Sequence, residues 1–76
     1  MDTETIQNIL EKSLPGAEIT VADLTGTQDH FEVQVLWEGF KGKSLIQQHQ
    51  VIHQALAMPL EDGSIHALKI KTMKAQ

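Results

Sequence analysis

The chain contains no cysteine, no tyrosine and no arginine, and only three of its 76 residues are aromatic. Without cysteine, no disulfide can hold the fold and no thiolate can act as nucleophile or metal ligand. No apolar run approaches the roughly 18 residues that a membrane span needs. The acidic first residues, Met1 to Glu4, lack the apolar stretch of a signal peptide. We therefore expect a cytoplasmic protein without a membrane association.

Charge is low and unevenly distributed. The formal net charge is -4 and every basic residue is a lysine, most of them in the second half of the chain. An acidic balance argues against strong non-specific binding to nucleic acid. A chain of 76 residues is expected to form one domain, residues 1–76, with a small core. No set of residues resembles a catalytic triad, a pair of catalytic carboxylates or a phosphate-binding loop, so we do not expect an enzyme.

The longest helix is predicted over residues 43–56, with Ser44 as N-cap. Leu45, His49, Ile52 and Leu56 follow helical spacing and are expected to form its buried face. The interpretation of His49 is therefore a structural histidine in the core, whose ring must find a hydrogen-bond partner.

The remaining pattern predicts an earlier helix over residues 3–14 and a short helical turn over residues 58–63. It also predicts three strands, over residues 18–24, 30–37 and 65–73. Residues 30–37 alternate most strictly, and His66 is expected to face the core from the last strand. A hairpin followed by a right-handed crossover makes the third strand parallel to the second. The predicted fold is α+β, an αββαβ two-layer sandwich whose helices cover one face of a mixed three-stranded sheet.

Four segments together resemble the BolA-like proteins, in order and over nearly the whole chain: F-E-V-Q-V at 31–35, F-K-G-K-S-L at 40–45, Q-H-Q at 48–50 and I-H-A-L-K-I-K-T at 65–72. The resemblance implies a class II KH-like topology. It also implies a non-catalytic role as partner of a monothiol glutaredoxin. The two proteins hold a bridging [2Fe–2S] cluster in iron–sulfur trafficking or iron-dependent regulation, and some members are linked to DNA binding and transcription regulation.

The resemblance implies that the partner and glutathione supply thiolates, while this chain supplies His66. A second ligand would come from the loop between the first two strands, which has neither cysteine nor histidine before His30. His30 is then the second candidate ligand, with Asp29 as an oxygen alternative. The other interpretations are that His66 binds a backbone carbonyl and that His30 is a polar residue at a hairpin entry. The isolated monomer is expected to carry no cluster and to form a heterodimer with its partner.

Two further candidate surfaces remain open. One is a basic, partly apolar face for docking glutaredoxin or the glutathione carboxylates, comprising Phe40, Lys41, Lys43, Lys69 and Lys71. The other interpretations are a solvated surface for the lysines and a core position for Phe40. The alternative function is a KH-like nucleic-acid-binding regulator, because residues 39–42 (Gly39, Phe40, Lys41 and Gly42) match the G-x-x-G loop. The favoured interpretation of that short pattern is a simple strand-to-helix turn that needs the flexibility of glycine. Gln48 replaces the arginine usual before His49, so we expect any nucleic-acid binding to be weak.

Overall fold

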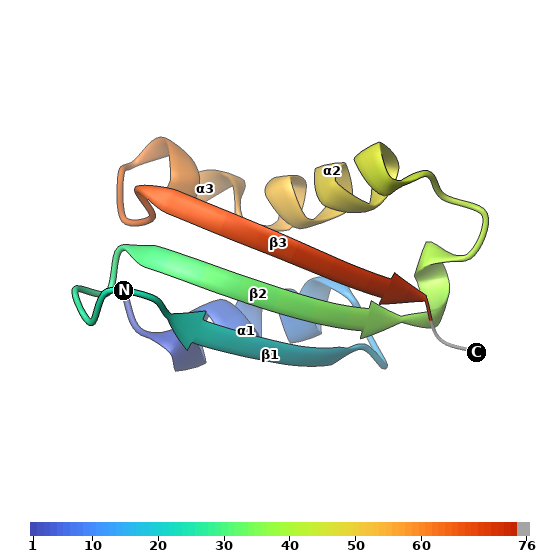
Figure 1. The fold of residues 1–76 in the computed structure, drawn as a ribbon, viewed down its shortest axis with the longest axis horizontal. Coiled ribbons are helices and arrows are strands. Elements are labelled where there is room, and N and C mark those ends of the chain that lie inside the picture. The colour runs from blue at the N-terminus through green and yellow to red at the C-terminus, as the bar shows by residue number, and fades with distance from the viewer. Residues whose placement is uncertain (75–76) are drawn as a thin grey trace.

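The computed structural model describes residues 1–74 and places the helices in one layer and the strands in the other (Figure 1). In chain order the elements are α1 (Thr3–Ser13), β1 (Glu18–Asp23), β2 (His30–Trp37), the 3₁₀ turn η1 (Glu38–Phe40), α2 (Leu45–Ala55), α3 (Ala57–Glu61) and β3 (Ala67–Lys74). The predicted order is confirmed, and the short helical turn is the separate helix α3.

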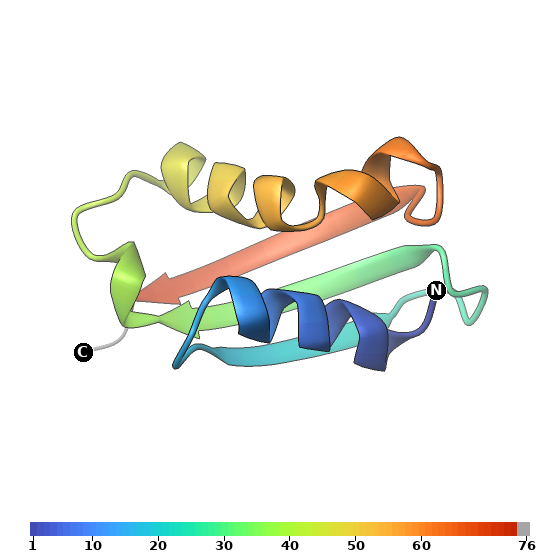
Figure 2. The same ribbon diagram turned by 180° about the vertical axis from the view of Figure 1, so that it is seen from behind.

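Within residues 1–74, the strands form one sheet in the order β1-β2-β3. β1 and β2 are antiparallel with Val21 opposite Val33, and β2 and β3 are parallel with Val33 opposite Ile70. Seen from behind, the helices lie on one face of the sheet (Figure 2). The α+β sandwich with a mixed sheet, predicted from alternation and the crossover rule, is therefore confirmed.

The core lies between this sheet face and the helices. Its buried members are apolar and come from both layers: Ile6, Leu10, Leu14, Phe31, Val33, Val35, Phe40, Ile52, Leu56 and Ile65. The alternate residues of β2 are only half-buried and face away from the helices. No helix within residues 1–74 combines the length and apolar character needed to cross a bilayer.

The predicted buried face of α2 is confirmed for Ile52 and Leu56, which are fully buried, and is wrong for Leu45 and His49. Ser44 caps the helix as expected, accepting from the backbone N–H of Gln47, whose side chain accepts from Ser44 N–H in return. Gln48 is buried, whereas Leu45 is 62% exposed and His49 is only half-buried. Gln48 can be buried because both ends of its side-chain amide are hydrogen-bonded. The amide nitrogen donates to the Lys43 carbonyl, and the amide oxygen accepts from the Thr72 hydroxyl.

The start of β3 also differs from the prediction. Leu68 and Ile70 pack against the core as expected. His66, however, precedes the strand, and its side chain is 61% exposed. The backbone amides of His66 and Ala67 both donate to the Asp29 carbonyl, at 2.7 and 3.3 Å, so the chain turns there before the β3 pleat begins. His66 therefore points to solvent at the end of the sheet.

Candidate metal-binding histidine pair

Two histidines that are distant in sequence meet where β2 and β3 begin. Because these strands are parallel, their first residues lie at the same end of the sheet, with His30 opposite Ala67. The Asp29 carbonyl ties this end together through the amides of His66 and Ala67. The strand pairing thus places His30 and His66 beside each other without any contribution from their side chains.

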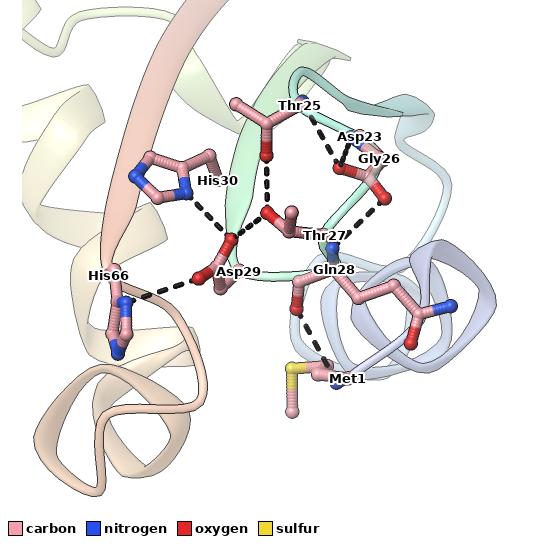
Figure 3. Close-up of polar contacts among 9 residues, drawn as sticks. All are labelled: Met1, Asp23, Thr25, Gly26, Thr27, Gln28, Asp29, His30 and His66. Atoms are coloured by element: carbon pink, nitrogen blue, oxygen red, sulfur yellow. Dashed lines mark hydrogen bonds and ion pairs between the residues drawn. The ribbon is translucent and has the colours of Figure 1, made fainter.

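The two imidazoles share one carboxylate (Figure 3). Nδ1 of His30 lies 2.6 Å from Oδ1 of Asp29, and Nδ1 of His66 lies 3.2 Å from Oδ2. The ring centroids are 6.1 Å apart and the ring planes are almost perpendicular, at 88°. The side chains of His30 and His66 are 40% and 61% exposed, so both rings are accessible to a partner.

The environment of Asp29 favours its charged form. A hydrogen bond from the Thr27 hydroxyl, followed by one from His30, lowers the pKa of Asp29, against a smaller opposing effect of burial. Positive charge on His30 or His66 lowers this pKa further. The carboxylate is therefore a stable acceptor between the rings at neutral pH.

The loop before β2 is held by a second carboxylate. Oδ1 of Asp23 accepts from the amides of Thr25 and Gly26 at 3.3 and 2.9 Å, and Oδ2 accepts from the amide of Gln28 at 3.1 Å. The chain leaves Gln28 with a positive φ of 61° and enters β2. Asp23 thus binds the backbone amides of residues that follow it in the chain, and these hydrogen bonds shape the loop that carries Asp29.

The pair can supply part of a metal coordination shell. Imidazole is a good ligand for iron, zinc and copper. Among residues 1–74, no group of three or more histidine, aspartate or glutamate side chains is arranged to hold a metal ion. A metal ion bound by this pair would therefore need further ligands that these residues do not supply.

The other predicted site residues lie elsewhere. Phe40 is fully buried and packs edge-to-face on Trp37, with ring centroids 5.2 Å apart. Its predicted role as an exposed partner contact is wrong, because the strand-to-helix turn folds the ring into the core. Lys41 and Lys43 follow Phe40 at the end of the sheet opposite the histidines, and the molecule is 34 Å long. The segment between η1 and α2, which carries these two lysines, lies at the opposite end of the sheet from the starts of β2 and β3 (Figure 1).

The G-x-x-G segment has a structural explanation. A Cβ on Gly39 would come within 2.6 Å of the Trp37 ring, so glycine is required there by packing. Gly42 has a φ of +79°, which a turn residue with a side chain adopts at a cost. This segment connects a strand, β2, to a helix, α2. It does not connect the two consecutive helices α2 and α3, which meet at Leu56. The geometry favours the simple turn over a nucleic-acid clamp.

Two residues of the site were missed or assigned differently from the sequence. The sequence offers Asp29 as an alternative metal ligand, whereas in the structure its oxygens face the Nδ1 atoms of the histidines. Thr27, whose hydroxyl donates to Oδ1 of Asp29, was not singled out. A threonine in a polar loop carries no signal of its own, although its spacing of two from an aspartate beside a histidine could have suggested the contact.

The family model of the BolA-like proteins matches residues 5–76. The chain belongs to the BolA-like protein family. Over 73 residues it is 37% identical to protein RP812 of Rickettsia prowazekii, covering 96% of this chain and 94% of that protein. It is 36% identical over 74 residues to the protein BOLA2 of Arabidopsis thaliana, covering 96% of this chain and 75% of that protein.

Solved BolA structures have the same fold as this BolA-like chain. The BolA domain of SufE1 from Arabidopsis thaliana superposes with a TM-score of 0.84 at 29% identity, covering 97% of this chain and 94% of that one. The NMR structure of RP812 gives a TM-score of 0.75 at 34% identity, covering 100% and 97%. Family and fold are therefore established independently of the histidine geometry.

Proposed function

We propose that this BolA-like chain is a non-enzymatic partner of a monothiol glutaredoxin and holds part of a bridging [2Fe–2S] cluster through His66 and His30. One observation supports the proposal: two partly exposed imidazoles meet at one end of the sheet, each with Nδ1 within 3.2 Å of a common carboxylate. The role is iron–sulfur trafficking or iron-dependent regulation in the cytoplasm.

The ligand chemistry supports this assignment. In Rieske centres, two histidines replace two cysteines on one iron of a [2Fe–2S] cluster. This chain has no cysteine, so imidazole is the ligand that it can offer to such a centre. Two imidazoles fall short of the usual four protein ligands, and the remaining ones would be thiolates of glutaredoxin and glutathione. The isolated monomer is therefore expected to hold no cluster, and the heterodimer to hold one.

The lysines suggest where the partner docks. Lys69 and Lys71 are exposed and alternate with Leu68 and Ile70, which pack on the core, so the lysines lie on the sheet face that the helices leave open. They are roughly 7 and 13 Å along β3 from Ala67, beside the histidine pair. We place the glutaredoxin or glutathione carboxylates near Lys69 and Lys71, with Lys41 and Lys43 too distant to contact the same small ligand.

The test is to titrate the apo protein into cluster-loaded monothiol glutaredoxin with glutathione and to record visible absorbance and circular dichroism. The wild type should give a new spectrum that saturates at one chain per cluster. His66→Ala and His30→Ala should lose it, leaving the spectrum of the glutaredoxin homodimer. His53→Ala, which removes an exposed histidine on α2, is the matched control and should behave as wild type. Wild-type spectra from both site variants would contradict the proposal.

A pair of charge reversals separates the two groups of lysines. Lys69→Glu with Lys71→Glu should weaken formation of the mixed complex, and the loss should shrink at high salt because exposed charges are screened. Lys41→Glu with Lys43→Glu changes the net charge equally at the opposite end and should have little effect. An equal loss from both double variants would indicate general charge repulsion in place of a docking contact.

A further inference from the structure

We infer that Asp29 is the positioning residue of the histidine pair: one carboxylate, itself held by Thr27, fixes both imidazoles with Nδ1 protonated and turns both Nε2 atoms outward as the metal-binding atoms. The consequence for a cluster rests on the proposed function. The arrangement of the rings does not, because it belongs to the chain alone.

The tautomers follow from hydrogen-bond chemistry. An ionised carboxylate can only accept hydrogen bonds. Nδ1 of His30, hydrogen-bonded to Oδ1 of Asp29 at 2.6 Å, must therefore carry the hydrogen, and Nδ1 of His66, at ion-pair distance of 3.2 Å from Oδ2, is favoured in the same form. In a neutral imidazole the other nitrogen then keeps its lone pair, which is the form that binds a metal. The metal-binding atom of both histidines is Nε2.

Asp29 is itself held in place from several directions. The Thr27 hydroxyl donates to the same Oδ1 that faces His30, and the Thr25 hydroxyl lies against that of Thr27 (Figure 3). The Asp29 carbonyl accepts from the amide of His66 at 2.7 Å. One residue thus fixes both the backbone that places His66 and the side chain that orients its ring.

This arrangement makes Asp29 a poor direct ligand. Both of its oxygens face Nδ1 atoms, and Oδ1 accepts a further hydrogen bond from Thr27. Histidines that bind metals commonly donate their other ring N–H to a carboxylate, and loss of that partner costs about 10–100-fold in metal affinity. Asp29 therefore acts through the histidines and does not compete with them.

The first test needs no metal. Long-range proton–nitrogen NMR of the apo protein at about pH 8, where unperturbed histidines are neutral, distinguishes a protonated ring nitrogen from a bare one. In the wild type, His30 and His66 should both be protonated at Nδ1. In Asp29→Ala, both should lose that preference. An unchanged pattern in Asp29→Ala, or Nε2 protonation in the wild type, would overturn the inference.

A milder variant gives a sharper result. Asp29→Asn keeps one accepting oxygen and replaces the other by an NH₂ donor, so one ring should stay protonated at Nδ1 while the other switches. Asp62→Asn removes a carboxylate from the turn after α3 and is the charge-matched control, with both tautomers unchanged. Thr27→Val should partly reduce the preference of the two rings for Nδ1 protonation, and Thr27→Ser, which keeps the hydroxyl, should retain that preference. Circular dichroism melts confirm that each variant is folded.

The second test measures the shared cluster. Asp29→Ala should lower the apparent affinity for the glutaredoxin-bound cluster by about 10–100-fold, whereas Asp62→Asn should match the wild type. If the wild type forms no mixed cluster, the proposed function fails while the NMR result still decides the role of Asp29. If the cluster forms normally in a folded Asp29→Ala variant whose rings have changed tautomer, the positioning role toward the metal is wrong.

Discussion

The end of the sheet where β2 and β3 begin carries hydrogen-bonded polar side chains, whereas the end where they finish is closed by packed aromatic rings. We call the first the histidine end (residues 23–30 and 62–66) and the second the aromatic end (residues 37–44). At the histidine end, Asp29 binds two exposed imidazoles. At the aromatic end, Phe40 is fully buried against Trp37, whose indole N–H donates to the Pro15 carbonyl at 3.0 Å.

The difference between the two ends shows that a short sequence motif is weak evidence for function. The aromatic end holds the more recognisable pattern, G-x-x-G, yet packing and turn geometry explain both glycines. The histidine end holds no compact motif, yet it gathers titratable side chains that the core does not need. A polar cluster with partly exposed ligand atoms is better evidence for function than a short glycine pattern.

The largest effect should come from removing the aromatic packing. Phe40→Ala should lower the free energy of unfolding by about 3–5 kcal/mol, because it empties a fully buried site. Urea denaturation followed by far-ultraviolet circular dichroism measures this loss. The cluster spectra of the fraction that remains folded should be unchanged. A stability loss below about 1 kcal/mol would show that Phe40 does not anchor this end.

A smaller loss should follow Gly39→Ala. The added Cβ would meet the Trp37 ring at 2.6 Å, and overpacking of this kind costs about 1–3 kcal/mol. The fluorescence of Trp37, the single tryptophan, should also shift. Gly42→Asn is the control, because Asn tolerates a φ of +79° and a Cβ there meets nothing within 4 Å. Equal losses in both variants would rule out the contact with Trp37 as the cause.

The sequence determined the fold more fully than the site. The bounds of β2, His30–Trp37, match the prediction because its alternation is strict, and parallel pairing with β3 follows from the crossover rule. On α2, Ile52 and Leu56 are buried as predicted, but Gln48 is buried in place of His49, because nothing in the sequence distinguishes Gln48 from its neighbouring glutamines. Its burial depends on the Lys43 carbonyl and the Thr72 hydroxyl, which only the tertiary structure brings near.

The sequence predicts His30 and His66 as candidate ligands, and parallel strand pairing accounts for their proximity, but the geometry of the pair does not follow from the sequence. That Asp29 lies between the rings depends on a loop conformation that includes a positive φ at Gln28. A polar loop sequence does not specify such a conformation, because many turns satisfy the same residues.

At the histidine end, substitution should scarcely affect stability. The combined His30→Ala and His66→Ala variant should change the free energy of unfolding by no more than about 1 kcal/mol, because both side chains are substantially exposed. Urea denaturation followed by Trp37 fluorescence measures it. A loss as large as that of Phe40→Ala would mean that the pair is structural, and the contrast between the ends would fail.

The smallest effect should be a local response to acid. Asp62 ends α3 in the turn before β3, at the histidine end, and Asp2 follows Met1, whose amine contacts the Gln28 carbonyl at 3.5 Å. The carboxyl groups of Asp2, Asp29 and Asp62 all have a lowered pKa. A carboxyl group with a depressed folded pKa contributes stability above its unfolded pKa, about 3.9. That contribution is lost as the pH falls through the folded value, so the effect belongs below about pH 4.

Amide hydrogen exchange at about pH 7 and about pH 3 should therefore show the histidine end loosening first, after correction for intrinsic rates. The amides of Thr5 and Ser64 donate to Asp2 and Asp62 and should lose protection. Those of Lys41 and Lys43 donate to backbone carbonyls that do not titrate, and they should keep it. Asp62→Asn should abolish the response at Ser64 while leaving that at Thr5, since the Asn oxygen accepts at every pH. Simultaneous loosening of both ends would instead mean that acid acts on the fold as a whole, with no division between a polar end and a packed one.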